Sequence, residues 1–391
     1  MTATTVDIQG TCDPKFQAVF DTFANNFTER GDHGASVCVI VEGQTVVDLW
    51  GGFKDIARTE PWEEDTIANL WSATKGVSAI AGHVAADQGL LDFDAPVAKY
   101  WPEFAAEGKE KVPVRWLFTH QVGIVDFDGD HPDHISLNWD AVTSRLAATK
   151  PQWVPGTRSG YHATTWGWLV GEVVRRAVGA KSFGQYFREV VAKPTDADFW
   201  IGLPDSEHKR VARVFRERPA DGPSQPAPTL GGQGDEIAQR IGLLGIEKYS
   251  ASPGSPEWKR AEMPALNGHG NARGMARIYS PMANGGSING VTLMSPESVK
   301  RASQTIAAGM DRNNLTPMVR SLGFAKPSDS ADPRPREAFG HGGMGGSLGY
   351  ADPVNRLSFG YAMNMMSVAG GRPDTRADDL AAAAYASLKA K

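Results

Sequence analysis

The chain is poor in cysteine, in long apolar runs and in clusters of one charge. Its 391 residues contain two cysteines, Cys12 and Cys38. Cys38 lies in an apolar stretch, so idle or buried thiols are expected rather than a disulfide. No stretch approaches the roughly 20 apolar residues that cross a bilayer, and residues 1–11 lack the basic and apolar regions of an export signal. These absences predict a cytoplasmic protein with no membrane partner.

The net charge of −5 is spread over 40 basic and 45 acidic residues, and no basic stripe stands out. This pattern argues against nucleic acid as a partner. With 41% hydrophobic residues, the chain is long enough to bury one large core or the cores of two closely packed domains. The sequence shows no internal repeat and carries no sign of the oligomeric state.

Predicted strands occur at both ends of the chain, and the middle is helical. Strands are expected at residues 36–42 and 45–49, joined at Gly43 as a hairpin, and later at 321–325, 338–342, 347–351 and 357–364. Helical periodicity favours helices at residues 13–28, 72–84, 114–120, 139–148, 164–178, 183–191, 272–284 and 375–388. Thr375 and Asp378 have the spacing of a capping box for the last helix.

This order predicts a discontinuous domain with an antiparallel sheet, residues 1–70 and 265–391, interrupted by a helical domain, residues 71–264. Within the helical domain, residues 204–264 are rich in Pro, Gly, Ser and charge. Loops of this length in a compact chain are usually functional, so we expect an irregular, lid-like segment over a pocket.

A serine and a lysine stand three residues apart where an apolar helix begins, in Leu-Trp-Ser72-Ala-Thr-Lys75-Gly. One helical turn brings the Lys75 amine alongside the Ser72 hydroxyl, and the helix N-terminus favours negative charge there. Burial would favour the neutral amine, which can serve as a base for a serine hydroxyl. The structural alternative is a helix cap beside an ion-paired lysine.

Two other serines could compete with Ser72. Ser206 and Lys209 have the same spacing, but they lie in a polar stretch without an apolar helix behind them, so we assign them to the surface. Ser347 stands in Gly-Gly-Ser-Leu-Gly, which matches the nucleophile elbow of α/β-hydrolases. That fold needs a histidine after the serine, and the last histidine of the chain is His341. Ser347 is therefore not expected to be the nucleophile.

Residues 126–134 contain four aspartates and two histidines and could suggest a metal loop. The register of a calcium loop is missing, because Gly129 is misplaced and Leu137 stands where the bidentate acid should be. A solvated acidic loop at a pocket rim is expected instead, and no metal is predicted.

Two further motifs suit a reactive serine. Tyr161 follows a Pro-Gly turn and precedes a helix, so its phenol could complete a proton relay. The glycine-rich stretch from His341 to Tyr350 lies on a late strand, where a backbone N–H can point at a developing oxyanion. Beside Tyr161, His162 either tunes this relay or is structural, and Trp153 is a candidate pocket wall.

Taken together, these motifs resemble the serine β-lactamase and penicillin-binding-protein superfamily, and most closely the class C β-lactamase-like carboxylesterases of family VIII. The matching motifs are Ser72-x-x-Lys75, Leu117-Phe-Thr-His120 ending in Gly123, Pro155-Gly156 leading to Tyr161, and His341-Gly-Gly343. The resemblance implies an α+β fold, in which an antiparallel sheet flanked by helices packs on an all-helical domain. It implies an active site in the cleft between them and no metal or organic cofactor.

The resemblance also implies roles for single residues. Ser72 corresponds to the nucleophile, and Lys75 and Tyr161 to its proton-transfer partners, in an order that the sequence leaves open. The backbone N–H groups of Ser72 and Met344 correspond to the oxyanion hole. A substrate-binding role is expected for five residues: His341, Gly342, Gly343, His162 and Trp153.

Two departures from the family pattern bear on the substrate. Ala163 stands where an asparagine would hold an amide group, and His341-Gly342 replaces a Lys-Thr pair that would hold a carboxylate. Both favour a small neutral ester, so we predict a carboxylesterase that acts on short-chain esters through an acyl-enzyme. The alternatives are a β-lactamase, a D-amino-acid amidase or peptidase, or an acyltransferase.

Overall fold

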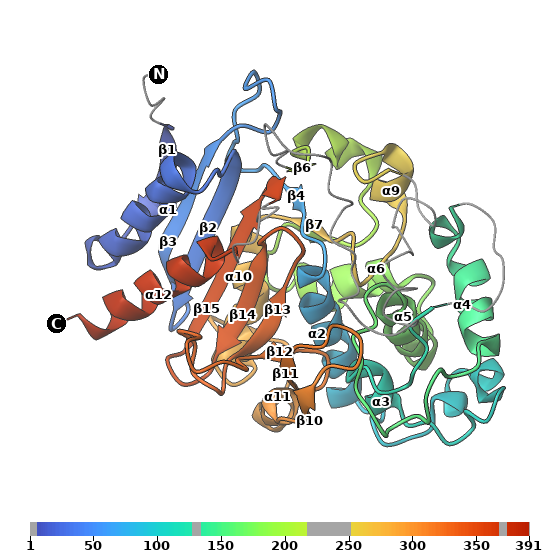
Figure 1. Cartoon of the computed structure of the whole chain (residues 1–391). Coiled ribbons are helices and arrows are strands. Elements are labelled where there is room, and N and C mark those ends of the chain that lie inside the picture. The colour runs from blue at the N-terminus through green and yellow to red at the C-terminus, as the bar shows by residue number, and fades with distance from the viewer. Residues whose placement is uncertain (1–5, 127–133, 217–251, 367–373, 391) are drawn as a thin grey trace.

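A computed structural model of the chain describes residues 6–126, 134–216, 252–366 and 374–390. Its main feature is an antiparallel sheet in the order β1-β3-β2-β15-β14-β13-β12-β11-β10. These strands are β1 (Ile8–Cys12), β3 (Gln44–Gly52), β2 (Gly34–Val41), β15 (Leu357–Met363), β14 (Leu348–Asp352), β13 (Phe339–Gly342), β12 (Ala325–Lys326), β11 (Pro317–Arg320) and β10 (Ala307–Met310). Because β2 pairs with β15, strands from opposite ends of the chain lie side by side at the middle of the sheet (Figure 1).

Helices cover both faces of this sheet. The first and last helices, α1 (Gln17–Glu29) and α12 (Arg376–Lys389), pack together on one face, where Phe23 and Leu380 are fully buried. On the opposite face α10 (Ala272–Ala283) packs against β2, β14 and β15 (Figure 1). The expected sheet flanked by helices is therefore confirmed.

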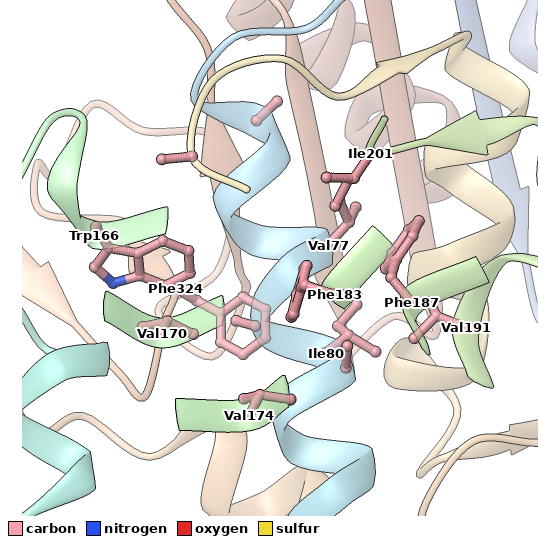
Figure 2. Packing of buried hydrophobic residues seen from close by; sticks show 14 of the residues in the cluster. Val77, Ile80, Trp166, Val170, Val174, Phe183, Phe187, Val191, Ile201 and Phe324 are labelled. Carbon is pink, nitrogen blue, oxygen red and sulfur yellow. The ribbon is translucent and has the colours of Figure 1, made fainter. Parts of the chain in front are cut away.

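The middle of the chain supplies the helices beside the sheet. They are α2 (Ala73–Asp87), α3 (Val114–Phe118), α4 (Trp139–Ala148), α5 (Thr165–Val178), α6 (Phe183–Phe187) and α9 (Pro256–Arg260). A further helix, α11 (Pro296–Ser303), lies near the edge of the sheet that β10 forms (Figure 1). α2 contacts α5 on one side and β13 and β14 on the other. Figure 2 shows Val77 and Ile80 of α2 among apolar side chains of α5 and of the segment after it. α2 is thus a central, buried helix, as its apolar composition predicts.

Shorter pairings complete the described structure. They are β7 (His269–Gly270) between β4 (Ala68–Asn69) and β5 (Phe199–Trp200), β16 (Met365–Met366) with β6 (Phe215–Arg216), and β8 (Ser287–Ile288) with β9 (Val291–Thr292). The hairpin at Gly43 is confirmed, because Glu42 and Gly43 both have positive φ, as a two-residue turn of this kind requires. No described helix is both long and apolar enough to cross a membrane.

Two local predictions are wrong, and several elements were not predicted. The strand expected over 321–325 is mostly a turn, because Gly323 adopts φ +88° and the Ser321 N–H bonds the Phe324 carbonyl. No capping box forms before α12, where the Thr375 hydroxyl donates to Asp379 (2.9 Å). The short strands β1, β10 and β11 and helix α11 were not predicted.

The expected lid-like segment is described only at its two ends. Residues 205–210 form a 3₁₀ helix and 256–260 form α9, so these ends are not irregular, whereas 217–251 lie outside the described residues. The division of the chain into domains after residues 70 and 264 stays a prediction.

Candidate active site

Ser72 occupies the N-cap position of α2 without a capping hydrogen bond from its side chain, and Lys75 follows one turn later. The Lys75 Nζ lies 3.1 Å from the Ser72 Oγ. It also donates hydrogen bonds to the backbone carbonyls of Ala163 (2.8 Å) and Ala265 (3.1 Å). Three segments that are distant in sequence therefore meet at one amine.

The Lys75 side chain is fully buried. Burial, and secondarily the positive charge of Arg320, holds its pKa well below the ordinary value of a lysine. A neutral amine has two N–H groups and one lone pair. The two carbonyls accept the two N–H groups, which leaves the lone pair for the hydroxyl proton of Ser72.

Tyr161 lies over this amine, with the Lys75 Nζ 4.9 Å from the centre of the phenol ring. Burial raises the pKa of Tyr161 to about 12, although its hydrogen bond with the Ser72 hydroxyl acts in the opposite direction. The phenol is therefore protonated at neutral pH and can donate a proton to a departing group. Ser72, Lys75 and Tyr161, chosen from sequence, are brought together.

The turn between β13 and β14 packs directly on the start of α2. A Cβ on Gly343 would lie 2.3 Å from the Leu70 carbonyl oxygen and 3.2 Å from the Ala73 nitrogen, so only glycine allows this approach. The Gly343 N–H bonds the Ser347 carbonyl (2.7 Å), whereas neither the Ser72 nor the Met344 N–H has a partner among the described residues. Both N–H groups are available for an oxyanion.

Ser347 supports this packing. It is buried, and its hydroxyl donates to the Leu70 carbonyl at 2.8 Å, two residues before Ser72. Ser206, the other rival serine, lies in the 3₁₀ helix 205–210, which buries none of its residues. Neither serine has the environment of Ser72.

His341 stacks on Tyr161 with ring centres 6.0 Å apart. Its Nδ1 lies 2.6 Å from the Gly342 carbonyl oxygen. Burial and the nearby Lys75 lower the pKa of His341 to about 3, so the ring is neutral at physiological pH. This position therefore carries no fixed cation.

His162 is fully occupied by the backbone. Its Nε2 accepts the Ile124 N–H (3.1 Å), and its Nδ1 bonds the Gly160 carbonyl (2.6 Å). Burial lowers its pKa to about 3. Because neither nitrogen is left for a substrate, we leave His162 out of the substrate-binding proposal.

Trp153 and His120 support the same segment. Trp153 packs edge-on against His162, with ring centres 5.8 Å apart. The His120 Nδ1 accepts the His162 N–H (3.0 Å), and its carbonyl accepts the Gly160 N–H (3.0 Å). His120 thus bonds the backbone of the segment that carries Tyr161.

Sequence reasoning missed features around this site that depend on tertiary contacts. Trp71, directly before Ser72, adopts a left-handed backbone (φ +49°) that bulky residues rarely occupy, and strain of this kind clusters at functional sites. Its ring packs on Trp258 of α9 (5.8 Å). Asp311 and Arg320 form a buried ion pair behind Tyr161. No sequence motif marks either feature.

The described residues include no group of three or more His, Cys, Asp or Glu side chains that could hold a metal ion. Most of the acidic loop 126–134 lies outside the described residues. The groups that meet at the site are a serine, an amine, a phenol and two backbone N–H groups.

Comparison with known proteins decides the family. The sequence profile of the beta-lactamase family matches residues 23–384. The chain belongs to the beta-lactamase family. A curated relative from Mycobacterium tuberculosis, named esterase/beta-lactamase LipL, is 36% identical over 370 residues, which cover 91% of this chain and 83% of LipL.

Two solved structures are also similar to this member of the beta-lactamase family. The crystal structure of a family VIII carboxylesterase has a TM-score of 0.88 and 39% identity, covering 98% of this chain and all of the other. A penicillin-binding protein homolog from Caulobacter crescentus also has a TM-score of 0.88, at 38% identity and the same coverage. The chain is thus an enzyme of the esterase and beta-lactamase type, a serine hydrolase.

Proposed function

We propose that the protein is a serine carboxylesterase that hydrolyses small, short-chain esters through an acyl-enzyme on Ser72. The observation that carries this proposal is the environment of Lys75, whose amine bonds two backbone carbonyls and the Ser72 hydroxyl while it is fully buried. A neutral amine held in this way is oriented as a base toward one proton only.

The proposed reaction has two halves. The Ser72 Oγ attacks the ester carbonyl carbon while its proton moves to the Lys75 Nζ, and the oxyanion is held by the N–H groups of Ser72 and Met344. The carbon–oxygen bond to the alcohol then breaks, and the alcohol leaves with a proton delivered through Tyr161. Water attacks the acyl-enzyme, the same groups move its proton, and the acid leaves Ser72 free.

Lys75 takes the first proton in this scheme. Its pKa is lowered, so the amine is free to accept a proton, whereas the raised pKa of Tyr161 keeps the phenol protonated. Two groups with pKa values pushed apart by their environments suit a base and an acid.

The choice of an ester rests on two positions. The Ala163 side chain is apolar, so no side-chain amide is present there to hold the amide of a substrate. His341 is neutral, so it offers no charge for a substrate carboxylate. For an amide or lactam substrate, the neutral hydrogen bond missing at Ala163 costs about 0.5–1.5 kcal/mol in the transition state, and the charge-assisted contact missing at His341 costs about 1.5–3 kcal/mol. An ester needs neither contact, because an alkoxide or phenolate leaves with less assistance than an amine.

Lactam cleavage is the second candidate, because the relative LipL is named both an esterase and a beta-lactamase. We propose that it is the slower activity. Acyl transfer to an alcohol would use the same acyl-enzyme.

Two measurements test the proposal. Mass spectrometry after incubation with p-nitrophenyl butyrate or a phosphonate should find the adduct on Ser72, and Ser72→Ala should form none. Values of kcat/KM for p-nitrophenyl butyrate should exceed those for a chromogenic cephalosporin and a D-alanine anilide by at least about tenfold. An adduct on Ser347 contradicts the mechanism, and equal rates contradict the ester preference.

A further inference from the structure

A buried ion pair lies at the edge of the sheet behind Tyr161. Arg320 ends β11, Asp311 follows β10, and their side chains are 10% and 1% exposed. The Arg320 Nη2 donates to the Asp311 Oδ2 at 2.5 Å. Removing two charges from water is costly, and a pair of apolar residues would often be at least as stable. Stability alone therefore does not account for this ion pair.

The acidic partner holds the backbone of Tyr161. Both Asp311 oxygens accept the Tyr161 N–H, at 3.1 and 3.2 Å. The backbone N–H of Asn313 donates to Asp311 (2.8 Å), and the side-chain amide of Asn313 donates to the Tyr161 carbonyl (3.0 Å). The two peptide groups on either side of this tyrosine are thus fixed from the sheet.

The basic partner holds the segment just before Tyr161. Its Nη1 donates to the Ser159 hydroxyl (2.6 Å), which in turn donates to the Thr119 carbonyl (2.9 Å). The guanidinium carbon also lies 5.7 Å from the centre of the Tyr161 ring. Arg320 therefore lies beside the phenol ring, bonds the segment before it, and is linked through Ser159 to the segment of Thr119.

The charge of Arg320 also reaches the rest of the site. After burial, it is the cause that lowers the pKa of Lys75, and it acts in the same direction on Tyr161. The titratable and charged groups that face this region come from α2, the loops after α3 and before α5, α10, the β10–β11 turn and β13: Lys75, His120, Tyr161, His162, Tyr279, Asp311, Arg320 and His341. The histidines of this set have lowered pKa values and are neutral, so Arg320 is the permanent cation among these groups.

We propose that Arg320, clamped by Asp311, is a positioning residue of the esterase: it fixes Tyr161 over Ser72 and supplies the positive potential under which Lys75 acts as a base. This inference rests on the proposed function. Arg320 itself is nearly buried, so it should contribute to kcat and to the pH profile rather than to substrate affinity.

The test compares Arg320→Gln, Arg320→Lys and the double variant Arg320→Gln/Asp311→Asn by kcat, KM and the pH dependence of kcat/KM with p-nitrophenyl butyrate. Arg320→Gln should lower kcat by about 10 to 100-fold with KM within about threefold. Without the nearby charge the pKa of Lys75 rises, so the acid limb of the pH profile of kcat/KM should move upward by about 0.5–1 pH unit. Arg320→Lys keeps the charge and should leave the limb in place.

Arg273→Gln is the matched control. Arg273 on α10 also pairs with a carboxylate, Asp48 at 2.5 Å, and lies 5.5 Å from an aromatic ring, that of Trp50, which belongs to no part of the site. It should change neither kcat nor the limb. The double variant removes both buried charges, so no unpaired Asp311 is left to prevent folding.

The inference is overturned if the folded double variant keeps a wild-type acid limb and a kcat within threefold of the control. The Ser72 adduct separates this outcome from failure of the proposed function. Labelling of Ser72 in wild-type protein, together with unchanged Arg320 variants, rejects the positioning role alone. Absence of any Ser72 label rejects the esterase mechanism itself.

Discussion

The N-terminal end of α2 and the far edge of the sheet each bury a basic side chain, but they treat it differently. Lys75 is fully buried and bonds only neutral oxygens among its described partners. Arg320 is 8% exposed and paired with Asp311. Without a counter-charge an amine is neutralised, whereas a guanidinium stays charged and needs a carboxylate. One region thus makes a base and the other holds a fixed charge.

The largest effect should come from making Lys75 resemble Arg320. Lys75→Arg replaces the neutral amine by a permanent cation that cannot accept a proton, so kcat should fall at least 10²-fold, on the order of removing a positioned base. Turnover of p-nitrophenyl butyrate at pH 7 measures this, with circular dichroism as the control for folding. A variant that keeps more than a tenth of wild-type kcat would show that proton acceptance by Lys75 is not needed.

The cost of charging a buried basic side chain can also be tested by lowering the pH. The buried residues His83, His162 and His269 have pKa values of about 4, 3 and 3, because burial disfavours their charged form. In the unfolded chain they titrate near 6.5, so their contribution to stability is complete above that pH and is lost as the pH falls toward 4. Each should cost about 2 kcal/mol of the free energy of unfolding at pH 5.

Urea unfolding at pH 7, 6 and 5 measures this loss. The window lies above the ordinary range of unfolded carboxyl groups, so histidines dominate it. An unfolding free energy that stays constant from pH 7 to pH 5 would mean that these rings take up protons as readily in the folded protein as in the unfolded chain.

A smaller effect on the free energy of unfolding is expected from the hydroxyl of a buried tyrosine beside α2. The Oη of buried Tyr279 has no partner among the described residues, and a Cβ on Gly76 would lie 2.0 Å from it. Tyr279→Phe should raise the free energy of unfolding by about 1 kcal/mol, because an unsatisfied buried group is removed. Gly76→Ala should lower it by about 1–3 kcal/mol through overpacking, and the double variant should recover part of that loss. Purely additive effects in thermal unfolding would argue against this contact.

The smallest effect on catalysis is expected at Ser347. Ser347→Ala removes the bond to the Leu70 carbonyl, which still accepts the Ala73 N–H at 3.1 Å. Stability should drop by about 1 kcal/mol and kcat/KM should stay within about threefold. Complete loss of activity in a folded variant would instead favour Ser347 as the nucleophile.

What could be predicted from the sequence follows the range of the interactions. Ser72 and Lys75 lie one helical turn apart, so local geometry alone brings them together. Long apolar strands such as β2 and β15 were also recognisable, but β11 begins with Pro317 and is four residues long. Arg320 and Asp311 meet across such short strands and therefore left no periodic signal. The backbone of Trp71 likewise depends on the packing around it.

The pairing of β2 with β15 has a consequence for the timing of synthesis. Ser72 is synthesised well before Met344 and before β15, the strand that pairs with β2 at the middle of the sheet. Contacts between such distant segments form slowly, after the chain has paid the entropy of closing a long loop. Nascent chains that end before β15 should therefore lack the proposed esterase activity.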